Sequence, residues 1–178
     1  MRLLARTRVT PDTLTWSGFI ITLGAAALVI TGHPLAAGLV VLCAGFFDIL
    51  DGALARHLGQ ATPFGAVLDS TLDRLSEAVL LFAILVSYGG APWMVSLVFL
   101  ALAGSLLVSY VKARAEAVGL QCKVGLFTRP ERVIVLALGL LLSHLTHALL
   151  IALAVIVVFS FVTAGQRLVY VWRQRKGG

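Results

Sequence analysis

Long apolar runs alternate with short polar breaks along the whole chain. Most of the runs are long enough to cross a bilayer as a helix, because crossing requires about 20 apolar residues. The breaks hold residues that end helices, such as Gly32-His33-Pro34 and Gly89-Gly90-Ala91-Pro92. The pattern predicts six helices: about Thr13–Gly32, Leu35–Leu58, Phe64–Tyr88 and Trp93–Val118, then a shorter one from Pro130 to about Leu142, and a sixth that carries Arg167 near its end.

The composition excludes a soluble globular protein. Of the 178 residues, 60% are hydrophobic and only 12% are charged, and the mean hydropathy is +1.00. A soluble domain is about half apolar and about a quarter charged, so the excess apolar surface must face lipid. We expect an all-α integral membrane protein with six transmembrane helices, which form a single domain over residues 1–178. Residues 1–12 would be a juxtamembrane segment.

Charged residues lie at one end of this predicted bundle. The turns at residues 32–34, 89–92 and 143–147 contain no Lys, Arg, Asp or Glu. The 22 charged residues (14 Lys and Arg, 8 Asp and Glu) lie at the chain ends, in the other connections or in the adjoining helix ends. Basic residues beside helix ends mark the cytoplasmic side of a membrane. We therefore expect a multi-pass protein of the cell membrane, with both termini and a polar active-site cavity on the cytoplasmic side.

Carboxylates stand inside the second and third apolar runs, at Asp48, Asp51, Asp69 and Asp73. A carboxylate in hydrocarbon costs several kcal/mol unless a cation neutralises it. On helices the members of each pair lie on one face, and antiparallel packing of the two helices would bring the pairs together. Oxygen ligands without His or Cys favour Mg²⁺, with Mn²⁺ as the alternative, and two ions about 3.5–4 Å apart would suit four carboxylates.

Buried salt bridges are the competing explanation for these acids. Arg56, Arg74 and Lys112 are the cations that could pair with them. Such pairs would explain one or two acids, but not two evenly spaced pairs with Gly52 and Gly65 on the same helical faces. We therefore favour a metal site.

The spacing of the acids resembles the signature of a known family. The pattern Asp-x2-Asp-Gly-x2-Ala-Arg-x8-Gly-x3-Asp-x3-Asp runs from Asp48 to Asp73 with every fixed position and gap in place. This is similar to the motif of the CDP-alcohol phosphotransferases, also called CDP-alcohol phosphatidyltransferases, and the similarity extends to the six-helix arrangement. The resemblance implies a homodimeric enzyme with a two-metal site that splits the pyrophosphate of a CDP-linked lipid.

The resemblance also implies roles for individual residues. Asp48, Asp51, Asp69 and Asp73 would hold the metals, and Asp73 would also be the general base on the incoming hydroxyl. The contacts to the CDP-lipid would be Gly52, Arg56 and Thr62, together with Asp12, Thr13, Leu14 and Thr15, which match the family's Pro-Asn/Asp-x-x-Thr stretch.

A second group of cations follows in the later helices. Residues 109–119 and 129–132, with the pair Gln166-Arg167, resemble stretches of the phosphatidylinositol-phosphate synthases of actinobacteria and related prokaryotes. By that resemblance Lys112, Arg132 and Arg167 would bind the phosphate of inositol 1-phosphate. Arginine and lysine are favoured phosphate ligands. The alternative for each is a side chain that reaches the lipid head groups.

The sequence therefore predicts a transferase that makes phosphatidylinositol phosphate and CMP from CDP-diacylglycerol and inositol 1-phosphate. Its partners would be these substrates, membrane lipids and a second copy of the chain, with no nucleic acid. Two alternatives within the family stay open: glycerol 3-phosphate as the acceptor and an archaeal-type CDP-lipid as the donor. A cation transporter would also place acids in a membrane, but its polar path should continue to the far side, whereas here the charges stop in the cytoplasmic half.

Overall fold

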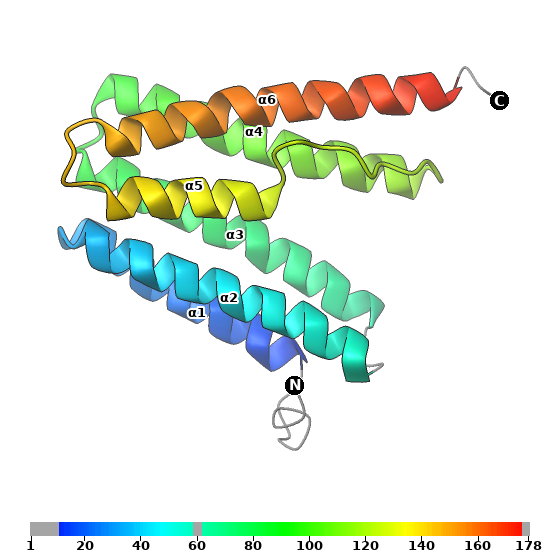
Figure 1. Cartoon of the computed structure of the whole chain (residues 1–178), viewed down its shortest axis with the longest axis horizontal. Helices are drawn as coiled ribbons and strands as arrows, with labels where there is room; N and C mark the ends of the chain where they lie inside the picture. The colour runs from blue at the N-terminus through cyan, green and yellow to red at the C-terminus, as the bar shows by residue number, and fades with distance from the viewer. Residues whose placement is uncertain (1–10, 59–61, 176–178) are drawn as a thin grey trace. The chain divides into compact units, whose positions relative to one another are not determined.

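The computed structural model describes the backbone of residues 11–58 and 62–175 and the side chains of residues 12–46 and 62–174. This part of the chain folds into six α-helices and contains no strand, which confirms the all-helical prediction. Figure 1 shows the helices, which are α1 (Pro11–Ile30), α2 (Pro34–Leu58), α3 (Pro63–Ser87), α4 (Pro92–Ala117), α5 (Arg129–Leu141) and α6 (Ala148–Arg175).

Prolines set the starts of the helices. The first four helices begin at Pro11, Pro34, Pro63 and Pro92. Proline suits the first helical position because its φ is already near the helical value and its missing N–H would have no intrahelical partner there. The turn before α2 is made by Gly32, whose φ of +80° lies in the left-handed region that favours glycine.

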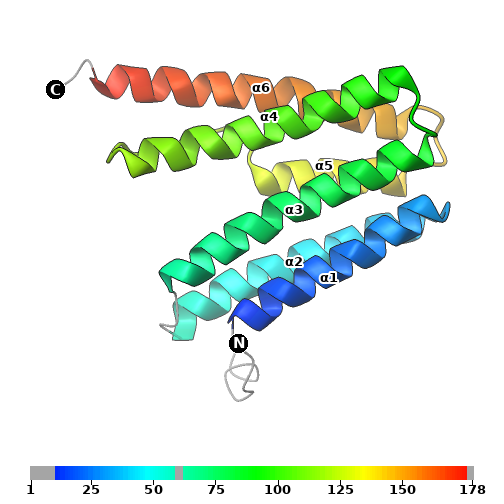
Figure 2. The same ribbon diagram turned by 180° about the vertical axis from the view of Figure 1, so that it is seen from behind.

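The chain divides into two compact units, residues 1–87 and residues 88–178. In the first unit α1 packs against both α2 and α3, as Figures 1 and 2 show. Small side chains allow close packing in this unit: Ala25 of α1 and Ala37 of α2 have no exposed surface. A Cβ atom on Gly18 would lie 4.0 Å from the carbonyl oxygen of Ala44, which brings the backbones of α1 and α2 together. The helix α1 is thus the common neighbour of the two acid-bearing helices.

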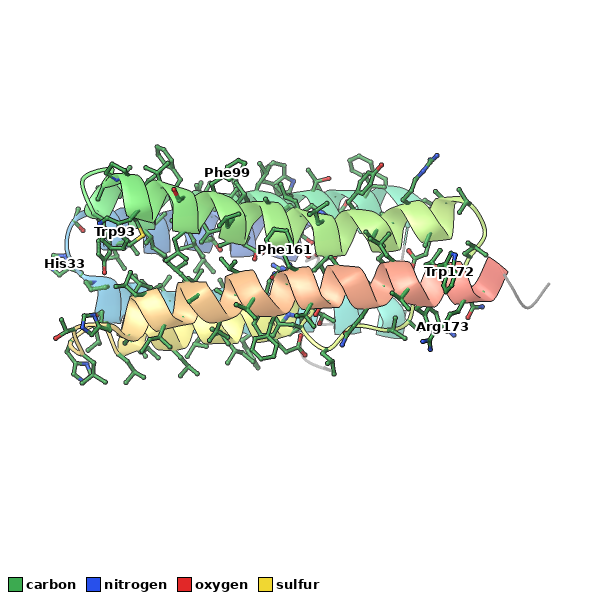
Figure 3. The ribbon with its side chains drawn as sticks, turned by 90° about the horizontal axis from the view of Figure 1, so that it is seen from above. His33, Trp93, Phe99, Phe161, Trp172 and Arg173 are labelled. Carbon is green, nitrogen blue, oxygen red and sulfur yellow. The ribbon has the colours of Figure 1, made fainter. Side chains whose placement is uncertain are left out.

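In the second unit α6 packs against both α4 and α5. Glycines make both contacts close. A Cβ atom on Gly104 would lie 3.0 Å from Cβ of Ser160, and one on Gly139 would lie only 2.6 Å from Cβ of Ala152. Phe161 lies between α4 and α6 (Figure 3), where its ring would be 3.3 Å from a Cβ on Gly104. The core of this unit is therefore built on α6.

The connection between α4 and α5, residues 118–128, lies along α6. Its residues bond to α6 in reverse order: the side chain of Gln174 donates to the carbonyl of Gln121 at 2.6 Å, and the Phe127 N–H donates to Thr163 Oγ1 at 3.1 Å. Phe127, late in the connection, bonds to Thr163, whereas Gln121, early in the connection, bonds to Gln174 near the end of α6. The connection therefore runs antiparallel to α6. The connection is fastened to the helix rather than projecting from it.

Within the part of the chain that the structure describes, three helical segments are long and apolar enough to cross a membrane: Asp12–Ile30, Pro92–Ala117 and Ala148–Gln174. Trp93 and Trp172 are half-exposed, at 52% and 55%, and lie at opposite ends of the second unit (Figure 3), as expected for aromatic residues at the two faces of a bilayer. These helices support the prediction of a membrane protein.

The remaining three predicted spans stay predictions. The apolar part of α2 with described side chains covers Pro34–Phe46, and α3 carries charged residues in its first half. The helix α5 has 13 residues. At about 1.5 Å per residue it is shorter than the hydrocarbon core of a bilayer, which is about 30 Å thick.

Candidate active site

The structure places the first half of the predicted motif on α2. Asp48, Asp51, Gly52 and Arg56 all belong to this helix, so the spacing of three residues between the two acids puts them on one helical face. Their side chains lie outside the described residues. The predicted roles of these residues in binding metal and CDP-lipid stay predictions.

The second half of the motif forms a stripe along α3. Gly65, Asp69 and Asp73 follow one another at intervals of four residues on this helix, so they share one face. Both aspartates are half-buried. Arg74, a candidate salt-bridge partner, donates a hydrogen bond to the Ser70 carbonyl of its own helix.

The N-terminal turn of α3 brings together residues from two separate parts of the sequence. Thr62 accepts a hydrogen bond from the Gly65 N–H at 2.9 Å, which satisfies one of the free donors at the helix start. A Cβ on Gly65 would lie 3.0 Å from Thr62 Oγ1 and 3.1 Å from Asp12 Oδ1. Asp12, Thr62 and Gly65 are thus direct neighbours. The absent side chain of Gly65 leaves room for both polar groups.

The first turn of α1 contains the other predicted CDP-lipid contacts. Asp12 is half-buried, Thr13 is exposed, and the Thr13 carbonyl accepts a hydrogen bond from Ser17 Oγ at 2.7 Å. Leu14 is only 8% exposed, so its side chain belongs to the core, and only its backbone is available to a ligand. Thr15 is half-buried. The polar members of this turn are therefore the better candidates for contacts with a ligand.

The predicted acceptor-phosphate residues all lie in the second unit. Lys112 is an exposed residue of α4 and forms an ion pair with Glu116 at 3.8 Å, one turn along the helix. With side chains about half exposed, such a pair contributes only about 0.3–0.5 kcal/mol. The pair therefore leaves Lys112 available to an anion at little cost.

The two arginines of this set are buried. Arg132 in the first turn of α5 is 2% exposed, and Arg167 in α6 is 6% exposed. Arg167 Nε donates to the Val124 carbonyl at 2.9 Å, and its Nη1 donates to the Val108 carbonyl. The burial of these guanidinium groups was not predicted from the sequence.

A capping box begins α5 directly before Arg132. The carboxylate of Glu131 accepts hydrogen bonds from the Thr128 N–H at 2.8 Å and from the Thr128 hydroxyl at 2.6 Å. The hydrogen bond from the Thr128 side chain is the main cause that lowers the pKa of Glu131 below its usual value. This end of α5 lies outside the long apolar segments. The spacing Thr-x-x-Glu is the sequence signal for this cap.

A cavity of about 600 Å³ opens between α6 and the connection of residues 118–128 in the second unit. It is lined by Val124, Gly125, Leu126, Gln166, Val169, Tyr170 and Arg173. A second cavity, of about 700 Å³, lies at the other end of α5 and is mainly apolar, with His144 and His147 in its lining. No sequence pattern indicated either cavity, because their walls combine loop and helix residues of ordinary composition.

The described side chains hold no cluster of three or more His, Cys, Asp or Glu residues that could bind a metal. Only Asp69 and Asp73 of the four predicted ligands belong to that part of the chain. Their placement on one face of α3 fits an all-oxygen site, in which half-buried carboxylates are suitable ligands for a divalent cation.

Comparison with protein families gives one matching family model. A family model described as CDP-alcohol phosphatidyltransferase matches residues 8–163. The archaetidylinositol phosphate synthase of Methanothermobacter thermautotrophicus is 39% identical over 167 residues, which are 93% of this chain and 84% of that protein. The phosphatidylinositol phosphate synthase of Mycobacteroides abscessus is 41% identical over 173 residues, which are 93% of this chain and 78% of that protein.

The fold is also similar to that of solved structures of a phosphatidylinositol phosphate synthase. The phosphatidylinositol phosphate synthase of Mycobacterium tuberculosis with CDP-diacylglycerol bound matches with a TM-score of 0.85 and 36% identity, over 96% of this chain and 90% of that one. A structure of the same protein in complex with manganese and citrate also has a TM-score of 0.85, over 96% of this chain and 86% of that one.

Proposed function

Because the chain belongs to the CDP-alcohol phosphatidyltransferase family, we propose that it transfers the phosphatidyl group of CDP-diacylglycerol to the hydroxyl of inositol 1-phosphate. The products are phosphatidylinositol phosphate and CMP. The family model covers residues from both units, which supports a single catalytic domain over residues 1–178. The observation that carries the choice of a phosphorylated acceptor is the pair of buried arginines in the second unit, Arg132 and Arg167.

Residues of the first unit hold the CDP-lipid in this proposal. The M. tuberculosis relative binds CDP-diacylglycerol, and the matched region includes the motif residues of this chain. The neighbours Asp12 and Thr62 would contact the CDP moiety, along with Gly52 and Arg56 of α2. Thr62 uses an oxygen lone pair to accept the Gly65 N–H, so its hydroxyl hydrogen can still be donated to a phosphate or ribose oxygen.

Asp48, Asp51, Asp69 and Asp73 would hold divalent metal ions. The M. tuberculosis relative binds manganese, and Mg²⁺ suits the same oxygen ligands, so we propose two ions of either kind. Bound ions of this type neutralise charge that develops on phosphate oxygens. The chain's own part is to position these carboxylates on single faces of α2 and α3.

Asp73 acts as the general base in the proposed reaction. Its carboxylate takes the proton from the acceptor hydroxyl, and the freed oxygen forms a bond to the phosphorus of the phosphatidyl group. The bond between that phosphorus and the oxygen of CMP then breaks, and CMP leaves. Asp73 is half-buried, so the residue is partly shielded from solvent.

Lys112, Arg132 and Arg167 bind the acceptor phosphate in this proposal. Arg132 and Arg167 are both buried, and burying a guanidinium charge is costly unless its surroundings compensate it. An anion that binds these arginines would offset this cost and form charge-assisted hydrogen bonds with them. Lys112 adds a mobile positive charge, since its ion pair with Glu116 is exposed.

The proposed enzyme lies in a cell membrane, and its active site opens to the cytoplasm. It works as a homodimer. The basic residues of the sequence lie at the ends that the positive-inside rule assigns to the cytoplasm. CMP is polar and must leave into water, whereas the lipid tails stay in the bilayer. A site at a membrane surface meets both needs.

The test is CMP release by purified protein with CDP-diacylglycerol and one acceptor at a time. We expect product from inositol 1-phosphate, loss of that product in Asp73→Asn, and an unchanged melting temperature for the variant. Full activity of Asp73→Asn would overturn the assignment of the base. Product from glycerol 3-phosphate alone would replace the proposed acceptor.

The donor lipid has a second candidate. Relatives of nearly equal identity are named for archaetidylinositol phosphate and for phosphatidylinositol phosphate, so their names agree on the inositol phosphate and differ in the lipid. An archaeal-type CDP-lipid should therefore be assayed beside CDP-diacylglycerol. A much higher kcat/KM for the archaeal-type lipid would replace the proposed donor.

A further inference from the structure

The side chain of Arg167 joins three segments of the second unit. It belongs to α6, its Nη1 donates to the Val108 carbonyl of α4, and its Nε donates to the Val124 carbonyl of the connection. The hydrogen bonds of Thr163 and Gln174 to the connection lie on either side of this contact. The guanidinium group is therefore held by backbone atoms on two sides.

This arrangement determines which donors of Arg167 remain for a ligand. A guanidinium has five N–H donors: one on Nε and two on each terminal nitrogen. Backbone carbonyls take the Nε donor and one from Nη1. The Nη2 edge is the part that these two bonds leave to an anion. If the guanidinium group rotated slightly, an anion at the same place would meet N–H donors that already bond to a backbone carbonyl, instead of those on Nη2.

Gly125 lies directly against the guanidinium. A Cβ at this position would be 3.1 Å from Arg167 Nε, 3.1 Å from Arg167 Nη2 and 3.1 Å from Thr163 Cγ2. The φ of Gly125 is +150°, a conformation that residues with side chains rarely adopt. Glycine thus lets the connection come close to the Nε and Nη2 atoms of Arg167.

We propose that Gly125 is a positioning residue for the acceptor phosphate. Its missing side chain allows the Val124 carbonyl and the guanidinium to meet, and so fixes the Nη2 edge in one orientation. This inference rests on the proposed function of Arg167 as a phosphate ligand. Gly125 itself touches the arginine, not the substrate.

The decisive variant is Gly125→Ala, with Gly119→Ala as the matched control. Gly119 lies in the same connection and also has a positive φ, +81°, but a Cβ there would meet nothing within 4 Å. Both variants strain the backbone, and only Gly125→Ala also displaces Arg167. We expect Gly125→Ala to raise the KM for inositol 1-phosphate about tenfold, with kcat and the KM for CDP-diacylglycerol changed less than about twofold.

A double-mutant cycle separates positioning from damage to the loop. In Arg167→Lys the planar fork is absent, so a methyl group at position 125 has no guanidinium to displace. We expect Gly125→Ala to change the acceptor KM by less than about twofold in that background. Equal effects in both backgrounds, or an equal effect of Gly119→Ala in the native background, would show that the loop alone is damaged and would overturn the proposal.

If the proposed function is wrong, the native protein itself will give no product from inositol 1-phosphate. This outcome is distinct from failure of the positioning role, in which the native protein is active. Binding can still be measured, with inorganic phosphate as the probe and the rise in melting temperature as the readout. Stabilisation by phosphate in the native protein and in Gly119→Ala, but not in Gly125→Ala, supports the positioning role. Equal behaviour of all three proteins toward phosphate overturns it.

Discussion

Replacing Gly65 with alanine should weaken the binding of the CDP-lipid while leaving the stability of the fold nearly unchanged. The new Cβ would lie 3.0 Å from Thr62 Oγ1 and 3.1 Å from Asp12 Oδ1, closer than ordinary van der Waals contact. Both side chains would have to shift by a few tenths of an ångström. Both side chains are among those that we propose as contacts of the CDP moiety.

The effect on stability can be worked out from opposing contributions. Disturbing the Thr62 cap costs about 1 kcal/mol. Alanine in place of glycine within a helix contributes about 1 kcal/mol in the opposite direction. The net change in the free energy of unfolding is therefore close to zero. The binding of the ligand has no such compensation, because a lost hydrogen bond to a charged group costs about 1.5–3 kcal/mol, and each 1.4 kcal/mol is tenfold in affinity.

The assay measures initial rates of CMP release against the surface concentration of CDP-diacylglycerol, together with thermal unfolding followed by tryptophan fluorescence. We expect the KM for the CDP-lipid to rise at least about tenfold and the melting temperature to move by less than about 2 °C. Gly24→Ala in α1 is the control, because a Cβ there meets nothing within 4 Å. An unchanged KM for the lipid in Gly65→Ala would refute the reasoning.

Further predictions concern packing, pH and metal. Gly139→Ala should destabilise the protein by about 1–3 kcal/mol, because its Cβ would overlap Ala152, whereas Gly165→Ala, with open space around it, should not lower the melting temperature. Glu131 has a lowered pKa, so its contribution to stability is full above the usual pKa of a carboxyl group and is lost as the pH falls through its own. Glu131→Gln should therefore narrow the difference in melting temperature between about pH 7 and about pH 3.5. Excess EDTA should abolish CMP release, and Mg²⁺ or Mn²⁺ should restore it.

The sequence was sufficient to predict the helices, and it placed their starts slightly late. The helices expected from about Leu35, Phe64 and Trp93 begin one residue earlier in the structure, at Pro34, Pro63 and Pro92. Each difference has the same cause. The turn residues Gly and Pro suggest that proline ends each turn, whereas its restricted φ and missing N–H make it a good first residue of a helix.

The site was less predictable where it depends on backbone groups. The stripe of Gly65, Asp69 and Asp73 follows directly from helical periodicity. The proximity of Asp12 to Gly65 does not follow from periodicity, because the two residues belong to different helices. The hydrogen bonds of Arg167 to backbone carbonyls do not follow either, because carbonyl groups occur at every residue and have no sequence signature. The connection of residues 118–128 also lacks periodicity, so its path along α6 could be seen only in the structure.

The charge of Arg167 supports a role beyond joining segments of the chain. A neutral glutamine amide also has two N–H donors and could bond two carbonyls without burying a charge. An arginine within an apolar helix costs at least about 2.5 kcal/mol even when its side chain can adjust. Arg167 is 6% exposed, so its charge bears this cost of burial. The two carbonyl groups that accept hydrogen bonds from Arg167 do not neutralise its charge, whereas a bound phosphate would, and this supports the proposed role of Arg167 as a phosphate ligand.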